Sequence, residues 1–146
     1  MTRSALSLIA LLFLPACVSG TPVSTTAAPG AQDTNPQEAG RIFAAMCINT
    51  LPDYAGAAEA AAAFPLTQSA STGTYFHNSQ NLSFKLTGDS CSMVAGTASS
   101  DPVAFIVDTM RSASDAATYL DADVTIGERM GPDGKFYLTA RTTASN

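Results

Sequence analysis

The sequence predicts an α+β fold: a single small domain in which an antiparallel sheet of four to five strands carries helices on one face. Apolar residues follow helical spacing before Pro65 and again after Pro102, whereas apolar and polar residues alternate over 82–86, 91–95 and 136–141. Turn-forming residues separate the alternating runs, as they do in antiparallel hairpins. With 146 residues, the chain is long enough for one modest core.

The first 16 residues are typical of an export signal. Arg3 provides a positive charge, residues 5–14 are uncharged and mostly apolar, and small residues follow. The run of ten is too short to span a bilayer, which takes about 20 apolar residues. We therefore expect residues 1–16 to be removed as a signal peptide.

The end of this segment (Leu14, Pro15, Ala16, Cys17) resembles the lipobox of bacterial lipoproteins. In that family, a Leu three positions before a Cys and a small residue just before it direct acylation of the thiol and cleavage ahead of it. The resemblance implies that Cys17 is the lipidated N-terminus of the mature chain. Pro15 departs from the usual small residue, which leaves open an ordinary signal-peptidase cut with Cys17 as a spare thiol.

The chain has three cysteines, and an odd thiol in an exported protein needs an explanation. Acylation of Cys17 supplies one. We then expect Cys47 and Cys91 to form a disulfide, as in other small exported domains. The alternative is that both are small buried apolar side chains.

Residues 17–37 are predicted to hold the lipidated Cys and a flexible tether. Pro22, Pro29 and Pro36 recur there among Ser, Thr, Gly and Ala, without any aromatic residue. Such a segment cannot bury enough apolar surface to order itself. The folded domain is therefore expected over 38–146. Charged residues make up 13% of the chain, about half the average for soluble proteins, which favours an exported protein.

Two helices are expected at the start of the domain. Ile42, Phe43, Met46 and Cys47 follow helical spacing. After Pro52, an alanine-rich helix with Asp53 as its N-cap is predicted to run to Phe64 and to end at Pro65.

Alternating residues then predict a hairpin. Residues 82–86 and 91–95 alternate between apolar and polar on either side of a turn at 87–90, which places Cys91 at the start of the second strand. Residues 74–76 are a candidate short strand ahead of it.

The strongest predicted helix begins at Asp101, followed by proline in its first position. Its apolar stripe is expected to pack on the sheet: Val103, Ile106, Val107 and Met110. Val124 and Ile126 indicate another strand, and a last strand from Phe136 follows a turn at 131–134.

Composition excludes several functions. Seven Lys and Arg against twelve Asp and Glu give a formal net charge of −5, so a nucleic-acid partner is not expected. His77 is the only histidine, so a histidine cluster for zinc is impossible. The acidic residues Asp121, Asp123 and Glu128 do not follow the spacing of a calcium loop and are interpreted as a solvated face. We expect no metal and no cofactor.

A catalytic assignment finds little support. Gly88, Asp89 and Ser90 resemble the start of the nucleophile block of GDS-type esterases, but no histidine follows them and Cys91 replaces an apolar residue of that block. A turn explains the same three residues, so no catalytic residue is assigned.

One polar run beside aromatic residues is the candidate recognition loop: Tyr75, Phe76, His77, Asn78 and Asn81. Aromatic side chains supply contact area at low entropic cost, and amides supply adaptable hydrogen bonds. The alternative is a loop without a ligand.

We therefore expect a lipid-anchored protein of the cell envelope that faces the periplasm and acts as a non-enzymatic binding or accessory module. Its expected partners are the membrane, through the lipid, and an envelope protein or glycan. The segment from Cys91 to Val94 and the position of Cys47 also resemble small uncharacterised secreted proteins and lipoproteins of proteobacteria, which implies a compartment but no activity. The alternative is a small hydrolase or hydrolase inhibitor acting through Ser90 or through Asp121 and Asp123.

Overall fold

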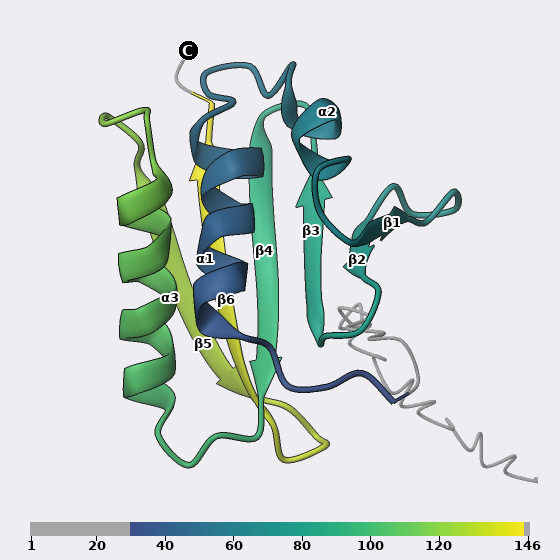
Figure 1. Cartoon of the computed structure of the whole chain (residues 1–146), viewed down its shortest axis with the longest axis vertical. Coiled ribbons are helices and arrows are strands. Elements are labelled where there is room, and N and C mark those ends of the chain that lie inside the picture. The colour runs from purple at the N-terminus through teal and green to yellow at the C-terminus, as the bar shows by residue number, and fades with distance from the viewer. Residues whose placement is uncertain (1–29, 145–146) are drawn as a thin grey trace, which may run out of the picture.

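The computed structural model describes residues 30–144, which form an antiparallel sheet with helices on one face (Figure 1). The predicted α+β class is confirmed, with six strands in place of four to five. The helices are α1 (Pro36–Phe43), its continuation as the π-helix η1 (Ala44–Ile48), α2 (Ala57–Ala61) and α3 (Pro102–Ala116). The strands are β1 (Leu66–Gln68), β2 (Tyr75–His77), β3 (Leu82–Leu86), β4 (Ser90–Thr97), β5 (Val124–Met130) and β6 (Phe136–Thr143).

The strands follow the order β1-β2-β3-β4-β6-β5 across the sheet. The expected hairpin is β3 and β4, with Phe84 opposite Met93. The last strand, β6, lies between β4 and β5, so that β5 is at one edge of the sheet and β1 is at the other. β1 was not expected, because three residues are too few to show alternation.

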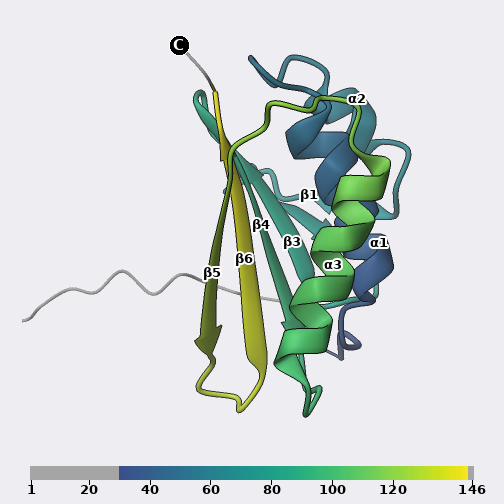
Figure 2. The ribbon, with the colours of Figure 1, turned by 90° about the vertical axis from the view of Figure 1, so that its left-hand side faces the viewer.

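Helices α1 and α3 lie beside each other over the same face of the sheet (Figure 2). They approach closely at Gly40, where a Cβ atom would collide with the carbonyl oxygen of Thr109. The core fills the space between these helices and the sheet. Its largest fully buried side chains include Phe43, Met46, Phe84, Met93 and Leu138.

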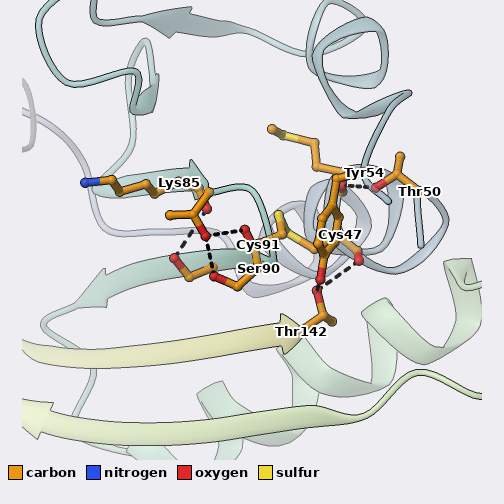
Figure 3. The surroundings of a disulfide bond; sticks show 10 residues. Cys47, Thr50, Tyr54, Lys85, Ser90, Cys91 and Thr142 are labelled. Carbon is orange, nitrogen blue, oxygen red and sulfur yellow. Dashed lines mark hydrogen bonds between the residues drawn. A yellow bond between two sulfur atoms is a disulfide. The ribbon is translucent and has the colours of Figure 1, made fainter. Parts of the chain in front are cut away.

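The predicted disulfide is present and joins η1 to β4 through this core (Figure 3). The Cα atoms of Cys47 and Cys91 are 5.2 Å apart, and both residues are fully buried. Nearby, the Thr142 hydroxyl donates to the Cys47 carbonyl oxygen at 3.0 Å. Because that bond uses the hydroxyl proton of Thr142, the Tyr54 hydroxyl is the donor in their 2.9 Å contact. The disulfide is thus tied to β6 as well.

The boundary between tether and domain at residue 38 was placed too late. Gln32 forms a parallel bridge with Gln80, and the buried Thr34 donates its hydroxyl to the Asn81 carbonyl oxygen at 2.7 Å. Helix α1 begins at Pro36 because the side chain of Asn35 accepts a hydrogen bond from the Glu38 amide. The signal peptide, Cys17 and the first part of the tether lie outside the described residues.

The second helix is shorter than expected and covers only Ala57–Ala61. Asp53 is not its N-cap, because its carboxylate accepts a hydrogen bond from the Ala55 amide and closes a local turn. Alanine-rich composition favours a helix, but here turns occupy both sides of a single helical segment.

The expected packing of α3 was also wrong in part. The helix buries Phe105, Thr109 and Ala113, whereas 68% of Val103 and 45% of Val107 is exposed. Phe105 packs edge-on against Phe136 of β6, which turns the neighbouring apolar stripe away from the centre of the sheet. Ile106 and Met110 lie half-buried between the two faces.

Candidate functional site

The first three residues of the proposed recognition loop form strand β2. Tyr75 and His77 belong to β2, which pairs with β1 on one side and β3 on the other. Alternation within the strand points both side chains into the protein, and they are only 8% and 3% exposed. Asn81 is also buried, Phe76 is half-buried, and Asn78 alone is exposed. The prediction of a shared recognition surface is therefore wrong.

His77 has a structural role. Its Nδ1 accepts hydrogen bonds from the backbone amides of Ser79 and Gln80, at 3.2 and 3.1 Å, which leaves the proton on Nε2. Nε2 lies 3.4 Å from Oε1 of Glu38, and the Gln80 side chain donates to the other oxygen of the same carboxylate. This network attaches the first turn of α1 to the loop after β2.

Asn81 takes part in a second network, on the face of the sheet that points away from helices α1 and α3. Its side-chain amide lies 3.4 Å from the Tyr137 hydroxyl, which donates to Asp133 at 2.7 Å. Burial, and then the bond to Asp133, raise the pKa of Tyr137, while the bond from Tyr137 lowers the pKa of the Asp133 carboxyl group. The phenol of Tyr137 keeps its proton in this arrangement. It therefore links β6 to the start of β3 and to the turn between β5 and β6, which is a structural role.

The candidate hydrolase residues do not assemble. Ser90 is buried at the start of β4, and its hydroxyl lies 2.7 Å from that of Thr87, so the turn interpretation of this segment is the correct one. Asp121 and Asp123 are exposed. Within residues 30–144, no three His, Cys, Asp or Glu side chains meet in an arrangement that could hold a metal ion.

A different part of the domain presents apolar side chains to solvent. A groove with a volume of about 190 Å³ lies between the second half of α3, the segment that connects α3 to β5, and the start of β5. Its apolar lining includes Met110, Ala113 and Ala117 from the helix end and Val124 from the strand. Val103 and Val107 continue the stripe of Met110 toward the start of α3, because residues three and four apart share a helix face.

Strand β5 extends this apolar surface. Val124, Ile126 and Met130 pair with Thr142, Ala140 and Phe136 of β6, whose side chains point toward the helices. Residues opposite each other in an antiparallel pair share a face, so the β5 side chains also point to the helix side. Ile126 is nevertheless 46% exposed and Met130 65%, so the described helices leave much of these side chains uncovered. We refer to the following residues as the α3–β5 surface: Val103, Val107, Met110, Val124, Ile126 and Met130.

Sequence reasoning missed this surface, although its signal was present. The apolar stripe of α3 is predicted to be the core face, and Val124 and Ile126 indicate a strand without showing which of its side chains are covered. Both patterns are equally typical of apolar side chains that are exposed and bind a partner protein.

The opposite face of the sheet is polar and partly basic. Lys85, Ser92 and Arg141 form one row across β3, β4 and β6, with both cations exposed. This face provides a contrast with the α3–β5 surface in the experiments below.

Among the helices of the described chain, none has the length and apolar character needed to cross a membrane. Comparison of the sequence with models of known protein families finds no match, and comparison with curated proteins and with solved structures finds none either.

Proposed function

We propose that this protein is a lipid-anchored module of the cell envelope that binds another envelope protein through its α3–β5 surface. One observation carries the proposal: large apolar side chains on two neighbouring elements stay exposed, among them Val103 at 68% and Met130 at 65%. Contiguous exposed apolar patches on soluble domains commonly mark interaction sites. Anchoring rests on the resemblance of residues 14–17 to a lipobox.

The position of the surface suits a tethered domain. The described chain enters the domain beside β2 and β3, where Gln32 bridges to Gln80. Strand β5 is at the opposite edge of the sheet, on the side of the molecule where α3 lies (Figure 1). The first described residues therefore lie away from the α3–β5 surface.

The chemistry of the surface favours a protein over a glycan. Valine, isoleucine and methionine side chains offer apolar area but no hydrogen bonds, whereas a glycan would need polar groups to replace those it makes with water. Glu128 lies on the same face of β5 as Ile126 and is exposed. We expect the partner to bring apolar anchor residues and a basic residue beside them.

Photo-crosslinking from defined positions tests this function. A photoreactive amino acid is placed at Val107 or at Met130 of the full chain in producing cells, and at Lys85 on the polar face as the control. We expect adducts with one envelope protein from both test positions, at least ten times more abundant than adducts from Lys85. Equal adducts from all three positions, or none from the two test positions, would contradict the proposal.

A charge placed in the surface provides a matched check. Val103→Asp introduces a carboxylate at a position that is 68% exposed, so the fold is expected to tolerate it. The same change should reduce the adduct formed from Val107 several-fold, because an unpaired charge would be buried under the partner. Ser92→Asp on the polar face should leave that adduct unchanged.

A further inference from the structure

The two edges of the sheet differ in length. β1 has three residues, whereas β5 has seven and contains neither proline nor lysine. In an antiparallel edge strand, every second residue directs its N–H and C=O groups away from the sheet, where they can pair with another strand. Among residues 30–144, the outer edge of β5 therefore has no pairing partner, and the exposed side chains of Ile126 and Met130 border it.

Strand β5 is complementary to itself in one register. Suppose that a second copy pairs antiparallel with β5 about a two-fold axis. The two sheets form one continuous sheet only if each helix-side residue of one copy lies opposite a helix-side residue of the other. With the axis at Ile126, that residue faces its own copy, and Val124 faces Glu128. One step further along each chain, on the other face, Asp123 then faces Arg129, an acid opposite a base.

Glu128 disfavours the neighbouring registers. An axis at Gly127 would make the two copies of Glu128 diagonal neighbours on one face, and an axis at Glu128 would place them directly opposite each other. Like charges opposite each other in a sheet are destabilising. An axis at Thr125 would need the turn at residues 120–121 to become extended. The register centred on Ile126 avoids all three penalties.

Arg129 is held on the face of β5 where Asp123 of the second copy would lie in this register. Its guanidinium carbon is 5.3 Å from the centre of the Tyr137 ring, a cation–π contact that restricts the side chain. Neither Arg129 nor Asp123 belongs to a salt bridge among residues 30–144. Two such pairs would form in a symmetric dimer, one on each side of the axis.

We propose that two copies of this chain pair through their β5 strands, with Ile126 on the two-fold axis, to form one continuous sheet. Both sets of helices then lie on the same side, so the two α3–β5 surfaces meet and form one apolar trough between the α3 helices. The use of this trough for binding rests on the proposed function, but pairing of the strands does not.

Cysteine cross-linking tests the register. Antiparallel residues on the axis have Cα atoms about 4.5–5.5 Å apart, which a disulfide can join, whereas residues two positions away from the axis are too far from their own copies. In the full chain extracted in mild detergent, Ile126→Cys should convert more than half of the protein to a covalent dimer under mild oxidation. Glu128→Cys, on the same strand and face, is the control and should convert less than a tenth. The unaltered chain reports any dimer formed through Cys17.

A charge exchange tests the ion pairs independently. Asp123→Arg and Arg129→Asp should each raise the dissociation constant of the dimer at least tenfold in sedimentation experiments, and the double variant should regain most of the affinity. Both residues are exposed, and circular dichroism shows whether the variants remain folded. Equal cross-linking of Ile126→Cys and Glu128→Cys, or a monomer at all concentrations, would overturn the dimer.

The two proposals fail in different ways. A monomeric chain that still forms adducts with another protein from Val107 and Met130 would refute the dimer and leave the binding function intact. A dimer that cross-links through Ile126→Cys but forms no such adducts would refute the binding function alone.

Discussion

Replacing Cys47 and Cys91 together by alanine is expected to lower the free energy of unfolding by about 4 kcal/mol, according to the loop-entropy relation. The bond joins residues 44 positions apart, so it removes much of the freedom of the unfolded chain. It also lies in the core, where both residues are fully buried. A small domain has only about 5–15 kcal/mol of stability in total. The loss should therefore lower both the urea concentration at the midpoint of unfolding and the Tm.

The chemically reduced protein provides the matched control for this variant. Reduction breaks the same covalent link without changing the sequence, so the reduced parent and the double variant should unfold at similar urea concentrations. A double variant whose stability stays within about 0.5 kcal/mol of the oxidised parent, the range of ordinary surface substitutions, would show that the link contributes little.

Cys17→Ala is expected to have the largest effect on localisation. If Cys17 carries the lipid, the variant either remains as an uncleaved precursor or is cleaved elsewhere and released into the soluble fraction. Two or more acyl chains account for stable anchoring, because each buried CH₂ contributes about 0.8 kcal/mol. Cell fractionation with mass measurement of the mature N-terminus distinguishes these outcomes.

Pro15→Ala is the matched control for the anchor. It restores the small residue usual at that position of a lipobox, so processing and membrane attachment should be at least as efficient as in the parent. A cleaved Cys17→Ala protein that still fractionates with the membrane would contradict lipidation at Cys17.

The hairpin and the disulfide could be predicted because both depend on local patterns. Residues 82–86 and 91–95 alternate cleanly around a turn, and burial of one face then determines the register. With Cys17 accounted for, only one pairing of the other two cysteines remained. These inferences needed no knowledge of how distant segments pack.

The packing of α3 could not be predicted, because helical periodicity shows that a helix has an apolar face but not how wide the surface beneath it is. Its stripe through Val103 and Val107 is as apolar as a core face. The face that is buried instead contains Thr109, whose hydroxyl bonds to the Phe105 carbonyl oxygen within the helix. That local bond makes a threonine acceptable in the core, which a hydrophobic pattern does not reveal.

The recognition site was misplaced for a related reason. Tyr75 and His77 were judged by their own chemistry, in which aromatic and polar groups suggest contact with a ligand. Their burial depends on β1, a strand of three residues, and on Glu38 at the start of α1. The contact with Glu38 joins segments 39 positions apart, and local sequence patterns do not reveal it. A polar side chain such as His77 is buried because contacts of this kind, together with the amides of Ser79 and Gln80, satisfy it.

Hydrogen exchange along β5 tests most directly the claim that the protein binds through the side formed by α3 and β5. The exchange rates of its amides are compared between the full chain in the membranes of producing cells and the same chain diluted to a monomer in detergent. In the membranes, partner binding or strand pairing should lower at least tenfold the exchange rates of those amides in 124–130 that point away from β6. The amides of β1, at the other edge of the sheet, are the control and should exchange equally fast in both states. Equal exchange of β5 in the two states would contradict the account.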